Sequence, residues 1–277
     1  MTTSTVPVGA SAPSAGPADV PPLGSARRFL RDSGIVFRRQ LRMNLRNPAW
    51  VIIGMLQPVL YLLLFGPLLE PLIGQLGATN AYTFFVPGML VQLGVFGAFF
   101  AGFSLIGEWR EGVIEAERVT PANRTALLVG RLYRDLLQLL VQALILVGLG
   151  FALGMDASVG GLVLGVLLTL LLGGACAAAS NALALTTKSE DVMAPVINMV
   201  MLPVLLLSGI LLPMTIGPAW LQTASDFMPI RWVVDGVRTS FAGDLASSTL
   251  LWGTVWALGL FAAAVWWGTA TFRRENA

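Results

Sequence analysis

Six long apolar runs limit what this chain can fold into. The runs at 49–69 and 192–225 contain no charged residue, and a helix needs about 20 apolar residues to cross a bilayer. Charged residues make up only 12% of the chain, against roughly 25% in a soluble domain, and the mean hydropathy is +0.77. A transmembrane barrel would show alternating segments of about 10 residues instead. The sequence therefore predicts an all-α polytopic membrane protein.

The positions of these runs predict six transmembrane helices. We place them at about 49–69, 82–106, 131–154, 159–187, 192–212 and 248–271. The uncharged stretch 192–225 is too long for one span and too short for two with a loop. We interpret 214–240 as a re-entrant helical hairpin before the last span, because such backbone is tolerated where protein or a cavity surrounds it. The marker residues of this region are Pro213, Pro218, Trp220, Pro229, Arg231, Asp235 and Arg238. In a helix, Arg231, Asp235 and Arg238 would share one face, and their i,i+4 and i,i+3 spacing allows ion pairs.

The N-terminal part divides into two segments. Residues 1–24 are rich in Ser, Thr, Pro, Ala and Gly with one charge, and without an apolar h-region they predict a disordered leader rather than a signal peptide. Residues 26–46 instead predict a basic amphipathic helix at the membrane interface, which opens a membrane domain at 25–274. Its marker residues are Arg31, Phe37, Arg38, Leu41, Arg42 and Arg46. A nucleic-acid patch is the rival interpretation, disfavoured because the segment runs straight into a span.

A short charged island, 107–121, separates the second and third spans. In a helix, Glu108, Glu111, Glu115 and Arg118 would share one face. Thr120-Pro121 suits an N-cap followed by proline at the first position of the next helix. The pattern predicts an amphipathic helix over 108–120 at the membrane surface.

Basic residues indicate which side of the membrane this island occupies. With the N-terminus inside, 15 of the 17 basic residues lie in cytoplasmic segments, and only Arg231 and Arg238 lie outside. The positive-inside rule then places both termini and the charged island in the cytoplasm.

Several kinds of chemistry are missing from the sequence. There is no histidine, so His-based metal sites and Ser-His-Asp triads are excluded. Lys188 is the only lysine and follows Thr187, so there is no P-loop. The single cysteine, Cys176, allows no intrachain disulfide and fits a packing role. We therefore predict no catalytic residue, no metal site and no enzyme activity.

The spans also lack the buried acids and bases of ion-coupled carriers. Their polar residues are interpreted as interhelical hydrogen-bonding groups: Gln57, Gln92, Gln138, Gln142, Asn181 and Asn198. A run of small residues, 173–180, allows close helix approach. The pattern favours a membrane component powered from elsewhere, and the helix at 108–118 is where a partner could act.

Three features in order resemble the ABC-2 type transporter permeases, especially the daunorubicin/doxorubicin-resistance branch. They are the basic helix before the first span, the stretch Glu108-Trp109-Arg110-Glu111-Gly112 to Thr120-Pro121, and the region 211–238 before the last span. The resemblance covers about 26–274.

That resemblance implies a homodimer of permease subunits, each docked on a separately encoded ATPase subunit. The chain would bind no cofactor itself, and ATP and Mg would belong to the two ATPase copies. The implied coupling-helix residues are Glu108, Trp109, Arg110, Glu111, Gly112, Glu115, Arg118, Thr120 and Pro121. The implied activity is export of an amphipathic drug-like or lipid-like substrate from the cytoplasm or inner leaflet across the cell membrane.

Other functions stay open from the sequence. Export of a lipid-linked glycan is the first alternative, although no row of aromatic residues suited to stacking on sugars follows the spans. An ATP-independent carrier and a lipid-processing membrane protein are less favoured, because the spans show no convergent polar groups.

Overall fold

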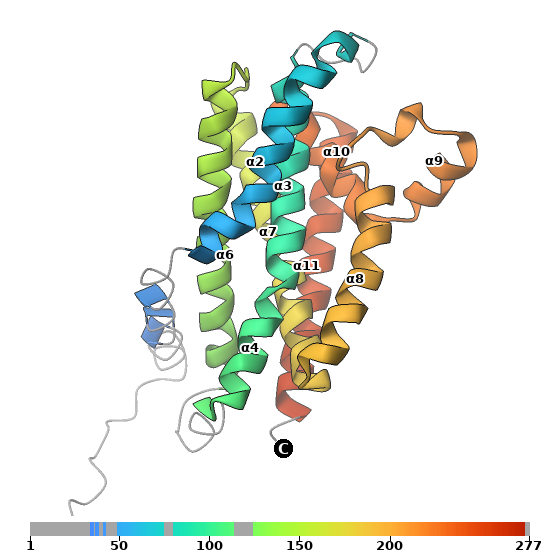
Figure 1. Cartoon of the computed structure of the whole chain (residues 1–277). Coiled ribbons are helices and arrows are strands. Elements are labelled where there is room, and N and C mark those ends of the chain that lie inside the picture. The colour runs from blue at the N-terminus through green and yellow to red at the C-terminus, as the bar shows by residue number, and fades with distance from the viewer. Residues whose placement is uncertain are drawn as a thin grey trace, which may run out of the picture.

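The computed structural model describes residues 34, 35, 37, 38, 41, 42, 49–74, 80–113 and 124–274 of the 277-residue chain. These residues form a bundle of long helices, and no strand occurs among them (Figure 1). Six helical segments in the described part are long and apolar enough to cross a membrane. This confirms the predicted all-α, six-span class. The segments comprise α2 (Ala49–Leu69), α3 (Ala81–Phe99) with α4 (Ala101–Arg110), α6 (Arg124–Ala152), α7 (Val159–Thr187), α8 (Glu190–Leu207) and α11 (Ser248–Arg274).

Helix α7 lies at the centre of the bundle and packs against α3, α4, α6, α10 and α11. Its run of small residues makes these approaches close. A Cβ added at Gly173 would lie 2.3 Å from Leu139 Cδ2 of α6, and one added at Gly174 would lie 2.8 Å from Phe261 Cε2 of α11. The predicted role of the small residues is thereby confirmed, and Cys176 is buried among them as a packing residue.

Several helix ends differ from the predicted spans. The second span continues to Arg110 as α4, and Glu108, which was expected at the surface, is buried inside the bundle. The third candidate span begins at Val129, close to the predicted 131, although its helix α6 starts earlier, at Arg124. The fifth ends at Leu207 rather than 212, because Gly209 adopts a φ of 74°, which ends the helical path.

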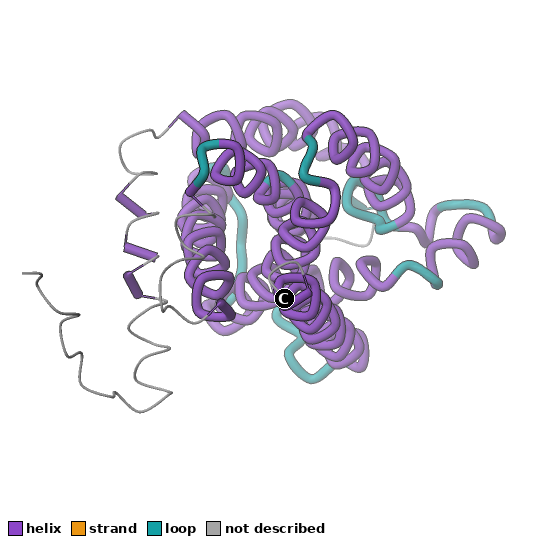
Figure 2. Tube along the Cα trace, turned by 90° about the horizontal axis from the view of Figure 1, so that it is seen from below, coloured by secondary structure: helices purple, strands orange, loops and turns teal. Residues whose placement is uncertain are grey.

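Between α8 and α11 the chain forms two short helices, α9 (Ala219–Asp226) and α10 (Pro229–Phe241), preceded by the 3₁₀ turn η2 (Met214–Ile216). Pro229 occupies the start of α10, where its missing N–H costs no helical hydrogen bond. Helix α10 packs on α3, α7 and α11, whereas α9 projects from one side of the bundle (Figures 1 and 2). The region 214–240 thus has the two helical limbs that the hairpin interpretation requires.

The predicted interfacial helix is described at six residues, all helical. Phe37 and Leu41 are half-buried, and Arg38 and Arg42 are exposed, as the amphipathic pattern requires. The predicted leader, Arg31 and Arg46 lie outside the described residues.

The contact between α7 and α10 provides a test of the packing. A Cβ at Gly161 would lie 2.0 Å from the Ser240 carbonyl oxygen, whereas one at the adjacent Gly160 would meet only Leu245 Cδ1 at 3.5 Å. Gly161→Ala is expected to lower the free energy of unfolding by about 1–3 kcal/mol through overpacking. Gly160→Ala, the matched control, should leave the thermal unfolding midpoint near that of the wild type. Equal midpoints for both variants would contradict the described packing.

Candidate functional site

The second span is broken at Phe100, between α3 and α4 (φ −78°, ψ −9°). Ser180 of α7 holds this break: its hydroxyl donates to the Phe99 carbonyl and accepts a hydrogen bond from the Gly102 N–H at 3.1 Å. Both backbone groups lie where helical bonding is interrupted, so one side chain supplies their partners. Helix α4 is therefore a separate limb hinged at Phe100 and fastened to α7.

Helix α4 is also joined to α6 by a buried ion pair. Arg131 donates to Glu108 Oε2 from Nη2 at 2.7 Å and from Nε at 3.0 Å, and the two side chains are 2% and 9% exposed. A buried pair of this kind is weak evidence for stability, but removing one of its two residues is strongly destabilising. The pair therefore fixes the position of the α4 end against α6.

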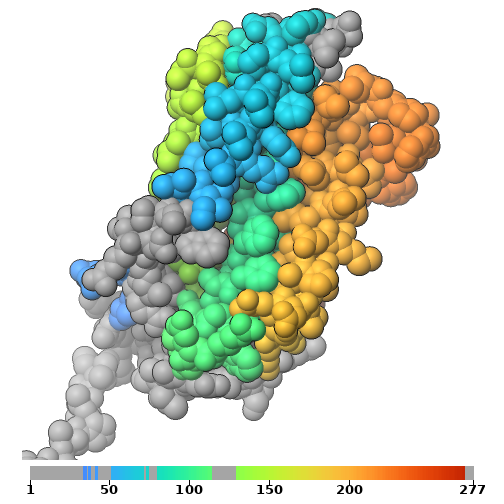
Figure 3. Space-filling view, viewed as in Figure 1, coloured from blue at the N-terminus to red at the C-terminus, as the bar shows by residue number. Residues whose placement is uncertain are grey.

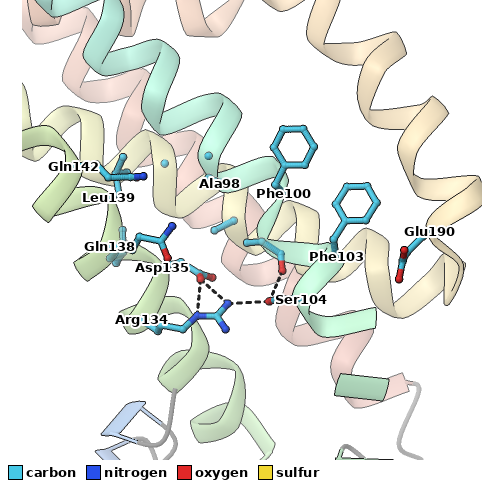
Figure 4. Close-up of a pocket in the computed structure, with 15 residues that line it drawn as sticks. Ala98, Phe100, Phe103, Ser104, Arg134, Asp135, Gln138, Leu139, Gln142 and Glu190 are labelled. Atoms are coloured by element: carbon cyan, nitrogen blue, oxygen red, sulfur yellow. Dashed lines mark hydrogen bonds and ion pairs between the residues drawn. The ribbon is translucent and has the colours of Figure 1, made fainter. Parts of the chain in front are cut away.

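A second ionic contact lies one turn away along α4. Arg134 donates to Asp135 Oδ1 from Nη2 at 2.7 Å and from Nε at 2.9 Å, and to the Ser104 hydroxyl at 3.0 Å (Figure 4). Ser104 in turn donates to the Ala101 carbonyl at 2.8 Å. Two arginines of α6 thus hold α4 at two successive turns.

These contacts correct the prediction that charged residues are nearly absent from the spans. Arg131, Arg134 and Asp135 lie in the first turns of the third candidate span, and both arginines are buried against α4. The sequence signal was the i,i+3 spacing of two arginines on an otherwise apolar helix. Their partner Glu108 was assigned to a surface helix, and only the packing of α4 on α6 joins them.

A cavity of about 670 Å³ opens beside these ionic contacts. Asp135, Gln138 and Gln142 line it from α6, and Phe100 and Phe103 line it from the hinge and α4 (Figure 4). Its volume lies in the usual range of small-molecule sites, about 300–1,000 Å³. Sequence reasoning missed the cavity because its lining comes from α3, α4, α6, α7 and the first residue of α8.

The predicted interhelical amides have different surroundings in the structure. Gln142 donates to the Val51 carbonyl at 3.2 Å and so joins α6 to α2, as predicted. Gln57 instead donates to Tyr61 Oη at 3.4 Å within α2. Gln92 is buried, and neither its amide nitrogen nor its oxygen has a hydrogen-bond partner among the described residues.

The charged island does not form one continuous helix from Glu108 onward. Helix α4 ends at Arg110, and Glu111 and Gly112 form a turn in which Gly112 has a φ of 72°. Val113 is helical again. Glu108 and Glu111 therefore do not share one helix face as predicted, because α4 ends between them and Glu108 is buried whereas Glu111 is exposed.

The island residues consequently have separate environments. Glu108 points into the bundle and Trp109 packs against the core, whereas Glu111 is exposed and Arg110 forms an ion pair with Glu190 at 3.0 Å. This end of α4 lies at the surface beside α8 (Figure 3). Glu115, Arg118, Thr120 and Pro121 lie outside the described residues.

A third cluster of charges lies in α10. Arg231 forms the predicted i,i+4 pair with Asp235, Nε to Oδ2 at 3.5 Å, and also contacts Asp226 and the Ser225 hydroxyl. Burial raises the pKa of Asp235, and the nearby cations Arg238 and Arg231 oppose that rise. The cluster joins α10 to the end of α9.

The contacts of Arg238 are with residues outside α10. Its Nη2 donates to the Ile210 carbonyl at 2.9 Å, and its guanidinium lies 4.4 Å from the ring centroid of Phe84. Helix α3 also approaches this contact closely at Gly88, where an added Cβ would lie 2.3 Å from the Ile210 oxygen. Arg238 therefore joins α10 to the α8–α9 connection and to α3. Of the other predicted residues here, Trp220 is 70% exposed and Pro218 immediately precedes α9.

Comparisons with known proteins agree on one family. The family model described as ABC-2 type transporter matches residues 32–242. A putative transport permease, ycf38, of Cyanophora paradoxa is 27% identical over 228 residues, which cover 80% of this chain and 79% of the relative. The daunorubicin resistance ABC transporter permease protein DrrB1 of Streptomyces coeruleorubidus is 28% identical over 199 residues, 71% of this chain and 70% of the relative. The ycf38 protein of Porphyra purpurea is 26% identical over 197 residues, 70% and 68% of the two chains.

Proposed function

The chain belongs to the ABC-2 type transporter family, and we propose that it is the transmembrane permease subunit of an ATP-driven exporter. Its substrate is an amphipathic drug-like or lipid-like molecule, which it moves out of the cytoplasm or the inner leaflet. The drug-resistance permease among its relatives supports this direction and substrate class. The cavity of about 670 Å³, with polar residues on one wall and phenylalanines on the other, supports an amphipathic ligand.

The observation that carries the proposal is the position of α4. One end of this limb is the exposed Glu111–Gly112 turn, and its body carries Phe103 and Ser104 of the cavity wall. The limb is hinged at Phe100 and held by buried polar contacts. A partner that displaces the turn would therefore change the cavity, and the free energy of ATP binding would favour one arrangement of α4 over the other.

The partners follow from this mechanism. The chain has no P-loop, so two copies of a separately encoded ATPase subunit would bind ATP and Mg. A second copy of the permease completes the exporter, which lies in the cell membrane with both termini in the cytoplasm. The exposed end of α4 and the residues that follow it form the docking segment for the ATPase.

Reversing the charge at Glu111 provides the test. Glu111→Arg is expected to reduce the amount of co-purified ABC ATPase about tenfold, the effect of roughly 1.4 kcal/mol, because it changes the charge of the proposed docking turn. The measurement is pull-down of an ATPase that supports export by the wild-type chain, with export followed in the same cells.

The matched control is Glu70→Arg, which makes the same change at an exposed residue beyond the other end of the bundle, after α2. It should leave both association and export unchanged. Wild-type association and export in Glu111→Arg would refute docking at this turn.

A further inference from the structure

We propose that the cavity beside α4 is a ligand-binding site contained within a single chain, and that it takes molecules with an apolar, ring-bearing body and a hydrogen-bond donor such as an amine or hydroxyl. The identification of this ligand with the transported substrate rests on the proposed function. The binding itself depends only on the cavity and can be measured without any ATPase.

The α6 wall supplies the polar recognition. Asp135, Gln138 and Gln142 follow one another at i, i+3 and i+7, so they form a polar stripe along one face of α6. The stripe faces the cavity and not lipid, and a ligand donor placed against it would not be exposed to the hydrocarbon interior.

Asp135 retains unused acceptor capacity. Its Oδ1 atom accepts both hydrogen bonds from Arg134, whereas its buried Oδ2 atom has no hydrogen-bond partner among the described residues. An unsatisfied carboxylate oxygen is costly when desolvated, so a donor that reaches it gains free energy. Asp135 lines the cavity, so its carboxylate is the acceptor that a ligand donor in the cavity would approach.

The opposite wall supplies apolar and aromatic surface. Phe100 and Phe103 are stacked with ring centroids 5.7 Å apart and an interplanar angle of 27°, and Phe100 is 54% exposed. Flat faces of this kind suit a ring-bearing ligand. The charged residues of the lining are Arg134, Asp135 and Glu190. Asp135 is paired with Arg134 and Glu190 with Arg110, so the lining selects for a hydrogen-bond donor that reaches Asp135 Oδ2 and not for net charge.

The glycine at the cavity's edge shows where space is available. A Cβ added at Gly97, which lines the cavity, would meet no atom within 4 Å. A large side chain there can enter the open volume without displacing the helices. Gly148 of α6 also has no atom within 4 Å of an added Cβ but does not line the cavity, so it serves as a matched position.

The test uses the purified full-length chain in lipid nanodiscs without an ATPase. Fluorescence anisotropy is measured with two planar probes, 9-aminoacridine, which is cationic at neutral pH, and acridine, which is uncharged. Saturable binding of 9-aminoacridine is expected in the wild type. Gly97→Phe should weaken it at least about tenfold by filling the cavity, the change expected for a lost contact of roughly 1.4 kcal/mol, and Gly148→Phe should not.

Further arms separate the contribution of Asp135 from general hydrophobicity. Asp135→Asn, accepted only if its thermal midpoint shows a folded protein, should weaken 9-aminoacridine more than acridine. Equal affinity of wild type and Gly97→Phe would overturn the site, as would the absence of saturable binding. If export persists although no ligand binds at this cavity, the ligand site is refuted and the proposed function stands. If ligand binds at the cavity but no ATP-dependent export occurs, the proposed function is refuted and the ligand site stands.

Discussion

Replacing Arg131 by methionine is expected to destabilise the protein by about 3–5 kcal/mol, the usual effect of removing one member of a buried ion pair. Glu108 would lose both hydrogen bonds from Arg131 at a site where its side chain is 9% exposed. The free energy of unfolding in detergent solution, measured by denaturant titration, tests this. Export should fall as well, because α4 loses one of its two polar contacts with α6.

The matched control is the ion pair at the end of the same helix. Arg110→Met also removes an arginine from a pair with a glutamate, Glu190, but the two side chains are 53% and 42% exposed. Exposed pairs contribute at most about 1 kcal/mol, so this variant should unfold almost as the wild type does. Similar losses in both variants would show that burial of the Glu108 pair does not matter.

Substituting Gly102 by alanine is expected to abolish or strongly reduce export. The added Cβ would lie 2.4 Å from Met193 Cε, 2.5 Å from the Ser180 carbonyl oxygen and 2.7 Å from its hydroxyl. The backbone oxygen cannot move away readily, so α4 must separate from α7, and the hydrogen bond from the Gly102 N–H to Ser180 is weakened. Overpacking of this kind costs about 1–3 kcal/mol, and it displaces the hinge that positions the cavity wall.

Gly107→Ala makes the same change one and a half turns further along α4, where an added Cβ meets nothing within 4 Å. Alanine is a better helix former than glycine by about 1 kcal/mol, so stability should be equal or slightly higher. Substrate export and thermal midpoint are measured for both variants. Normal export in Gly102→Ala with a wild-type midpoint would exclude the proposed role of the α4–α7 contact.

The described fold was largely predictable because a membrane span can be recognised from a continuous stretch of sequence, without knowledge of its neighbours in space. The hydrophobic runs, the breaks between them and the small residues of α7 are each visible in a local window of sequence, and the six candidate spans appear as predicted. The i,i+4 pair of Arg231 and Asp235 was predictable for the same reason, because helical periodicity alone brings these side chains together.

The site was less predictable, because its contacts join residues that are far apart in the chain. The sequence by itself determined that this is a six-span helical membrane protein with a charged segment after the second span and no P-loop motif. Only the tertiary structure decided that Glu108 leaves that segment to pair with Arg131, that Ser180 bridges the break at Phe100 and that a cavity remains beside them. Helical periodicity assigns a charge to a face, but whether that face meets water or another helix depends on packing.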